Sequence, residues 1–150
     1  MKPDKTIDFH IRWAWAKISR IYNHEAQKSG GTMSAGYILL SIDKEGTPST
    51  KLGPKMGMES RSLTRSLKTL EQEGLIYRQA DTMDRRKVLV FLTEKGLELR
   101  EKSKEVVIRF NEFVRLNIDN ERLDTFFDVM NELNDLLDKN NIFENLENKA

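Results

Sequence analysis

The stretch SRSLTRSLKTLEQEGLIYRQADTMDRRKVLVFLT, residues 60–93, decides the fold of this 150-residue chain. Its first half has helical spacing, because Leu63, Leu67 and Leu70 fall at i, i+4 and i+7 and share one face of a helix. The opposite face carries Arg61, Arg65, Lys68 and Gln72. Gly74 is the expected stop after the last turn. The spacing therefore predicts an amphipathic helix with one apolar face and one cationic face.

Beyond the glycine, the apolar period changes from helix to strand. Residues 75–79 and 87–92 are short runs rich in β-branched and aromatic side chains. The polar segment between them, residues 80–86, is too long for a two-residue hairpin turn. We therefore expect a two-stranded hairpin whose loop projects from the body of the protein.

Three helices are expected upstream of this stretch. Apolar spacing predicts the first over residues 7–26, and the glycine pair at 30–31 ends it. Ser34 is the expected N-cap of the second helix. Residues 47–49 are typical of a turn, and a short third helix follows to about residue 56.

Two longer helices are expected downstream. Thr93 caps the first, which runs to about Leu116, and Asp119 or Asn120 opens the second. Residues 139–150 are rich in Asn and Glu and are expected to fray. The fold class is thus mainly α with a small β-hairpin wing.

The absence of cysteine limits the chemistry of this chain. It excludes disulfides, thiolate metal sites, cysteine nucleophiles and thiol-based redox sensing. The longest apolar run, Val88 to Leu92, is far shorter than the ~20 residues that cross a bilayer. Since the N-terminus leads into a charged segment, no secretory signal is predicted either. We expect a soluble, cytoplasmic protein with no membrane partner.

Charge is distributed unevenly along the chain, although the formal net charge is only +1. Residues 48–93 carry nine Lys or Arg and five Asp or Glu, whereas residues 94–150 carry nine and fourteen. A basic middle can meet a polyanion, and the acidic C-terminal part would repel one.

The predicted order, a helix-turn-helix and then a hairpin with a basic loop, is that of a winged helix-turn-helix. A helix about 10 Å across fits the major groove of duplex DNA, where long side chains reach base edges. Arg61 and Arg65 are long enough for bidentate contacts to guanine, whereas Ser60, Ser62 and Thr64 can contact bases or phosphates. With Lys68, these are the residues of the helix expected to bind DNA. In the loop, Arg85, Arg86 and Lys87 can reach the neighbouring minor groove, whose negative potential attracts guanidinium groups.

Two other interpretations of this basic face stay open. A helix with one polar face is most often a solvated surface helix. The face can also belong to a helical dimeric module that binds another protein and does not read DNA. Duplex DNA is favoured because the face is almost wholly cationic and directly precedes a second cationic loop.

Nothing in the sequence points to catalysis or to a cofactor. The two histidines, His10 and His24, have no metal-ligand spacing around them. There is also no glycine-rich phosphate loop and no serine in a nucleophile context. We expect no bound metal, no cofactor and no enzymatic activity.

Two segments resemble the MarR family of transcriptional regulators. Residues 84–96, DRRKVLVFLTEKG, match the wing signature D-x-R-x-x-x-x-x-L-T-x-x-G of that family. Residues 57–65, closed by residues 70–76, resemble its recognition helix, and the order and lengths of the other elements also fit. One departure is Gly53-Pro54, where the family has good helix formers, so the third helix is expected to be short or irregular.

The resemblance implies a homodimer whose N- and C-terminal helices interlock and whose two winged domains straddle a pseudo-palindromic operator. Within residues 1–150, about 34–93 would form the winged part, while about 7–28 and 94–138 would be dimerisation helices. Arg86 would enter the minor groove, Asp84 would hold the wing in shape, and Arg65 would sit in the major groove. Many family members are repressors released by a small ligand, so the same mechanism is expected here.

The terminal helices carry more apolar surface than a lone winged domain needs, which also favours dimerisation over packing within one chain. The residues expected at the interface are Ile7, Ile11, Leu133 and Leu137, extended by Ile142, Phe143 and Leu146 if the tail is ordered.

The sequence offers a few candidate residues for a ligand pocket but does not identify the ligand. Trp13 and Trp15 are about 200° apart around a helix, so they cannot face the same surface. One of them, foremost Trp13, can line an effector pocket with His10 or Tyr37. Packing in the core is the more common role of such aromatic side chains.

Overall fold

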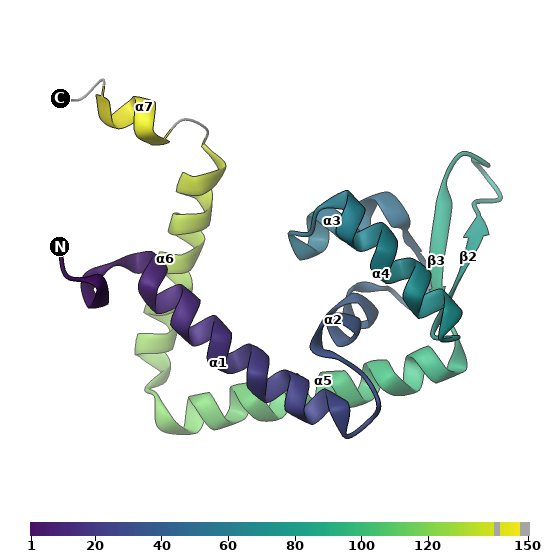
Figure 1. Ribbon diagram of the computed structural model, residues 1–150, viewed down its shortest axis with the longest axis horizontal. Coiled ribbons are helices and arrows are strands. Elements are labelled where there is room, and N and C mark those ends of the chain that lie inside the picture. The colour runs from purple at the N-terminus through teal and green to yellow at the C-terminus, as the bar shows by residue number, and fades with distance from the viewer. Residues whose placement is uncertain (140–141, 148–150) are drawn as a thin grey trace. The chain divides into compact units, whose positions relative to one another are not determined.

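The computed structural model describes residues 1–139 and 142–147, and the side chains of these residues except 144 and 145. The described part is mainly helical, with a small three-stranded antiparallel sheet (Figure 1). In chain order the elements are a 3-10 helix (Pro3–Lys5), α1 (Ile7–Gln27), α2 (Met33–Ser41), β1 (Thr47–Pro48), α3 (Ser49–Met56), α4 (Ser60–Gln72), β2 (Ile76–Ala80), β3 (Val88–Leu92), α5 (Glu94–Asn117), α6 (Asn120–Asp138) and α7 (Ile142–Glu147).

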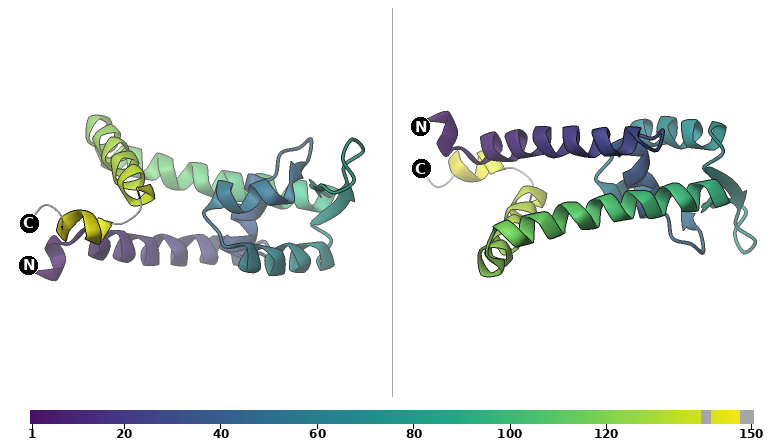
Figure 2. Two further views of the ribbon diagram at one scale, coloured as in Figure 1. Left: turned by 90° about the horizontal axis from the view of Figure 1, so that it is seen from above. Right: turned by 90° about the horizontal axis from the view of Figure 1, so that it is seen from below.

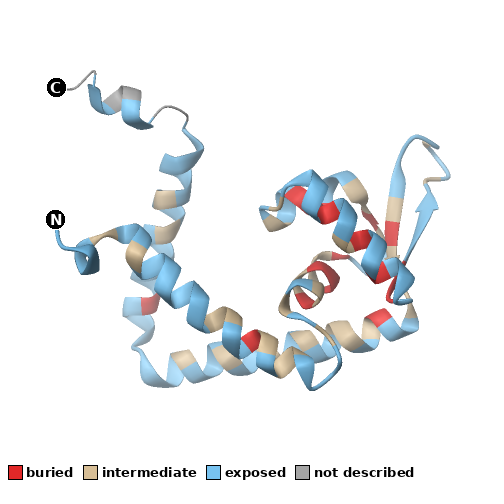
Figure 3. Cartoon of the chain, in the orientation of Figure 1, coloured by how far each residue is buried: buried red, intermediate tan, exposed pale blue. Residues whose placement is uncertain are grey.

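The chain divides into two compact units, residues 1–107 and 108–150, which we call unit 1 and unit 2. Unit 1 holds the helix-turn-helix, the sheet and the first half of α5. Its core lies between α2, α3, α4 and the sheet, where the buried residues gather (Figure 3). The fully buried side chains there are Ile38, Leu39, Ile42, Leu52, Ile76 and Val90. Burying one such side chain stabilises the fold by about 1.5–3 kcal/mol.

Helix α4 is formed as its spacing predicts. Leu63, Leu67 and Leu70 are all buried. The helix ends in a Schellman motif, since the N–H of Leu75 donates to the carbonyl of Leu70 (3.0 Å) and Gly74 has a left-handed φ of 71°. This end is what turns the chain into the sheet.

The predicted hairpin is present as β2 and β3, and β1, a strand that the sequence did not predict, pairs with β3, so the strand order is β1-β3-β2. Thr47 pairs with Val90 and is buried, and its Oγ1 accepts a hydrogen bond from the N–H of Asp43 (2.8 Å). Gly46 lets the chain turn into this strand: its φ is +97°, and a Cβ there would run into the ring of Phe91. A strand of two residues shows no alternation, which is why the segment was interpreted as a turn.

Two other local predictions are corrected, and one is confirmed. Helix α2 begins at Met33 and is capped by Thr32, whose Oγ1 accepts a hydrogen bond from the N–H of Ala35 (3.1 Å), and not by Ser34. Helix α3 is short, as expected, yet it continues through Pro54. In the tail, residues 142–147 form α7 where fraying was expected, and residues 140–141 and 148–150 lie outside the described residues.

Unit 2 contains the second half of α5, with α6 and α7. Leu123 is buried, and the Arg115 guanidinium bonds to Oδ1 of Asn120 (3.2 Å) and lies 6.0 Å from the centre of the Phe127 ring. Many large apolar side chains of this unit are exposed: Ile108, Phe113, Leu116, Ile118, Phe126, Phe127, Val129, Leu136, Leu137, Ile142, Phe143 and Leu146.

The start of α5 is joined to the end of α4 through Thr93. The N–H of Thr93 donates to the Leu75 carbonyl (3.1 Å), and its Oγ1 donates to the Gly74 carbonyl (2.6 Å) while accepting from the N–H of Gly96 (3.0 Å). Gly96 packs directly on the Leu75 carbonyl, with no room for a Cβ. The wing signature thus has a structural reason: Thr93 makes the joint and Gly96 allows the close approach.

A substitution at Gly96 tests this joint. We expect Gly96→Ala to lower the free energy of unfolding by about 1–3 kcal/mol, because the added methyl group meets the Leu75 carbonyl. The matched control is Gly31→Ala, where the nearest atom would lie at an ordinary contact distance of 3.6 Å. Urea unfolding at one protein concentration measures both. Equal stability of the two variants would contradict the close approach at Gly96.

Candidate nucleic-acid interface

The outer face of α4 is cationic and open to solvent. All six side chains predicted to contact DNA there are exposed: Ser60, Arg61, Ser62, Thr64, Arg65 and Lys68. Within the described residues, Arg61, Arg65 and Lys68 form no ion pair, so their charges are available to an anionic partner. The Thr64 hydroxyl donates to the Ser60 carbonyl (2.8 Å), which leaves its lone pairs as acceptors.

The loop between β2 and β3, residues 81–87, projects beyond α2, α3 and α4 (Figure 2). Two backbone hydrogen bonds close it, from the N–H of Asp81 to the Lys87 carbonyl and from the N–H of Lys87 to the Asp84 carbonyl, both 2.9 Å. Arg85, Arg86 and Lys87 are all exposed. The loop therefore presents three cations on a closed backbone.

Asp84 orients the loop from within. Its Oδ1 accepts hydrogen bonds from the backbone N–H of Arg86 (3.1 Å) and from the Arg86 guanidinium (3.3 Å). The Arg86 side chain is 92% exposed, so this ion pair contributes little to the stability of the fold. It holds Arg86 at the end of the loop while leaving most of the guanidinium open to a partner.

An ion pair that the sequence did not predict links the two cationic elements. Nε of Arg78 on β2 lies 2.9 Å from Oε2 of Glu71 on α4. Arg78 is on the same face of β2 as the buried Ile76, two residues away, so the period of the strand places it toward the helix. This contact holds the wing against the end of α4.

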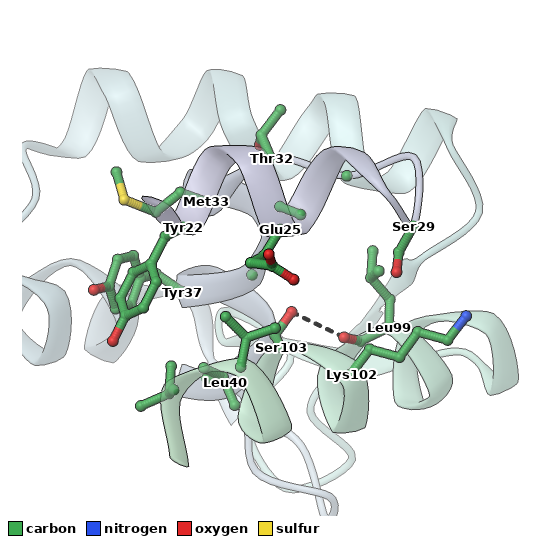
Figure 4. Close-up of a pocket in the computed structure, with 15 residues that line it drawn as sticks. Tyr22, Glu25, Ser29, Thr32, Met33, Tyr37, Leu40, Leu99, Lys102 and Ser103 are labelled. Carbon is green, nitrogen blue, oxygen red and sulfur yellow. Dashed lines mark hydrogen bonds between the residues drawn. The ribbon is translucent and has the colours of Figure 1, made fainter. Parts of the chain in front are cut away.

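Unit 1 also contains a pocket between α1, α2 and the first half of α5 (Figure 4). Its apolar walls come from all three helices and include Ala26, Met33, Leu40, Leu99, Val106 and Val107. The cavity has a volume of about 50 Å³, which suits a few waters or a small organic group. Beside the pocket α2 and α5 approach closely, since a Cβ on Gly36 would lie 2.9 Å from Oγ of Ser103.

Two tyrosines form one end of this pocket. The rings of Tyr22 and Tyr37 lie 6.1 Å apart, edge to face, and Figure 4 shows them together at one end. Burial, and to a smaller extent the neighbouring Tyr37, raises the pKa of Tyr22 to about 12. Burial also raises the pKa of Tyr37. Both hydroxyls are thus protonated at neutral pH and can donate hydrogen bonds.

Of the three predicted pocket residues, only Tyr37 lines this pocket. His10 is exposed, and its Nε2 lies 2.8 Å from the Asp4 carbonyl. Trp13 and Trp15 are about half exposed, so neither lies in the core of unit 1, which was expected as their more common role. Tyr22 and the α5 residues were missed because the pocket combines positions from three distant segments.

The residues predicted at a dimer interface differ in exposure. Ile7 (65%), Ile11 (43%) and Leu137 (55%) are exposed, and Leu133 is half-buried. Exposed apolar residues of this size leave surface that a partner can cover.

Residues 1–139 and 142–147 contain no candidate metal site and no candidate membrane span. No group of three His, Cys, Asp or Glu side chains there could hold a metal ion. No helix in the same ranges is long and apolar enough to cross a membrane.

A helix-turn-helix with unpaired cations on its second helix, followed by a cationic hairpin, defines a winged helix DNA-binding protein. The MarR family model matches residues 32–88. The regulator SarZ of Staphylococcus aureus strain MRSA252 is 32% identical over 117 residues, 76% of this chain and 74% of that protein. The chain belongs to the MarR family of DNA-binding transcriptional regulators, which are not enzymes.

Another relative is the organic hydroperoxide resistance transcriptional regulator of Bacillus subtilis strain 168. It is 39% identical over 69 residues, and the match spans about half of each protein, 46% of this chain and 47% of the relative. The sequence similarity to this relative thus covers only about half of each chain.

Solved structures support the fold. The PcaV regulator from Streptomyces coelicolor, in complex with its natural ligand, has a TM-score of 0.78 at 19% identity, covering 91% of this chain and 97% of that one. MepR of Staphylococcus aureus in complex with DNA has a TM-score of 0.78 at 17% identity, covering 85% and 96%. The chain therefore has the same fold as these two regulators.

Proposed function

We propose that this protein binds a pseudo-palindromic duplex in a sequence-specific way through α4 and the wing, and represses transcription there. The observation that carries the proposal is the set of exposed cations on α4 and on the adjoining hairpin loop. Within the described residues, only Arg86 among these cations forms an ion pair with a carboxylate. Helix α4 is placed to enter the major groove, with Arg61 and Arg65 reaching base edges. Arg86 enters the flanking minor groove, and Arg85 and Lys87 neutralise phosphates.

Single substitutions separate base recognition from phosphate contact. A preferred duplex is first selected from a randomised pool, and binding to it and to its single base-pair variants is then measured. We expect Arg65→Ala to lose about 1–3 kcal/mol of discrimination at the positions it reads. Lys87→Ala should weaken all duplexes by a similar factor and reduce the slope of log K against log salt by about 1.

Lys104→Ala, at an exposed position on α5, is the matched control and should behave as the wild type. If the pool yields no enriched duplex, sequence-specific binding is contradicted, and a protein-binding module that uses the basic face becomes the better interpretation.

We further infer that two copies assemble through the apolar residues exposed on α1 and α6. Soluble monomers rarely leave this much apolar surface uncovered. A two-fold symmetric dimer also matches a pseudo-palindromic site, whose half-sites are roughly one helical turn, ~34 Å, apart.

Sedimentation equilibrium tests the dimer. The wild type is expected at the mass of two chains, and Leu137→Glu is expected at the mass of one, because it buries a charge in the interface. Val88→Glu, at an exposed apolar position on the wing, is the control and should remain dimeric. A wild type that sediments at the mass of one chain at all concentrations would refute the assembly.

A small ligand with an apolar body, bound in the pocket of unit 1, is proposed to release the protein from DNA. Support comes from the apolar walls, from the two protonated tyrosines and from the position of the pocket against α2, which also packs in the core beneath α4. The PcaV structure holds a natural ligand. Because the chain has no cysteine, a thiol-oxidation switch does not compete with this mechanism.

The pocket is tested by filling it. Benzoate and 4-hydroxybenzoate are titrated into the complex with the selected duplex, and we expect at least one to weaken DNA binding about tenfold or more. Val106→Phe should bind the duplex like the wild type but lose this response, because the larger ring occupies the cavity. Release that persists unchanged in Val106→Phe would place the ligand elsewhere.

A further inference from the structure

Met83 occupies an unusual place in the hairpin loop. Its side chain is 93% exposed, and among the large apolar side chains of the described residues only Met1 is more exposed. A single exposed methionine needs no explanation on an ordinary surface. Here it stands on the loop that carries Arg85, Arg86 and Lys87, the cations proposed to approach DNA.

The backbone on both sides of Met83 is held in place by aspartates. The N–H of Met83 donates to Oδ1 of Asp81 (2.9 Å), and three residues later the N–H of Arg86 donates to Oδ1 of Asp84 (3.1 Å). With the two backbone hydrogen bonds that close the loop, this arrangement fixes where Met83 emerges. A preorganised loop loses little conformational entropy when it binds.

The cations around Met83 can attract a polyanion, whereas the uncharged side chain of Met83 cannot. Residues 81–87 contain three cations and two carboxylates, and each carboxylate already accepts a backbone N–H. An uncharged thioether gains nothing from phosphates, but it gains from covering the apolar deoxyribose walls of the minor groove. Methionine is also among the apolar side chains that other minor-groove proteins place in this groove, where they are inserted between base steps.

We propose that Met83 is an apolar contact of the wing with the minor groove of the bound duplex, next to Arg86. The inference rests on the proposed DNA binding by the wing. In this proposal, the contribution of Met83 to the affinity for DNA does not depend on salt, whereas the contributions of the two arginines and the lysine do. Since Met83 buries almost nothing within the chain, its contribution is made in the complex alone.

Two substitutions at Met83 test the proposal on the selected duplex. Met83→Ala is expected to weaken binding about four- to fifteenfold, which corresponds to the burial of one or two methylene groups. Met83→Leu keeps an apolar side chain of similar size and should bind within about twofold of the wild type. Both variants should unfold at the wild-type temperature and keep the wild-type salt slope, because no phosphate contact is lost.

Thr82→Ala, at the exposed neighbouring position, is the control for loop changes and should bind normally. If Met83→Ala binds like the wild type while Arg86→Ala binds weakly, the apolar contact is refuted and DNA binding by the wing stands. Equal losses in Met83→Ala and Met83→Leu would also refute an apolar contact. If Arg86→Ala has no effect either, the wing does not contact the duplex and the proposed function fails with it.

Discussion

The hydrogen bonds of Thr93 are the constraint on which the DNA-binding face depends. The Thr93 hydroxyl donates to the Gly74 carbonyl, just after α4, and accepts from the N–H of Gly96 in the first turn of α5. The backbone N–H of Thr93 donates to the Leu75 carbonyl, just before β2. Lys95 adds a bond from its Nζ to the Glu73 carbonyl (3.1 Å). A carbonyl at a helix end is a favourable site for a cation. Helix α4, the sheet and α5 are therefore joined at one point.

The arrangement of charge follows from this joint and from the apolar stripe of α4. Because Leu63, Leu67 and Leu70 are buried, the arginines and the lysine on the opposite face point to solvent. The ion pair between Glu71 and Arg78 then links α4 to β2. A partner that binds α4 meets the wing at a fixed position, which suits duplex DNA, whose two grooves alternate at a fixed spacing.

Strong local patterns made most of this fold predictable. The leucine spacing and Gly74 define α4, and Thr93 begins α5, because each of these signals acts within a few residues of itself. The strand at Thr47 and Pro48 was missed, since its pairing with Val90 and Leu89 is decided some forty residues away along the chain. The cap at Thr32 was misplaced by two residues because serine is the more favourable N-cap residue, so the sequence alone favoured Ser34.

The site was predictable to a similar degree. The exposed positions of α4 and of the wing follow from periodicity, so the predicted contacts were placed on the surface. The pocket was not, because Tyr22, Tyr37 and Val106 come from three helices whose packing no local pattern encodes. The tryptophans were expected in the core but are half exposed, because Tyr22 is the one residue of α1 that is buried within the chain.

Fluorescence anisotropy tests the central claim, that α4 and the wing together read duplex DNA. The protein is titrated onto its own upstream intergenic DNA with excess nonspecific competitor at several salt concentrations. We expect binding that resists the competitor and is abolished by Arg86→Ala. We also expect log K to fall with log salt with a slope of about 0.9 for each phosphate contact. Binding that the competitor erases, or that Arg86→Ala leaves unchanged, would contradict the claim.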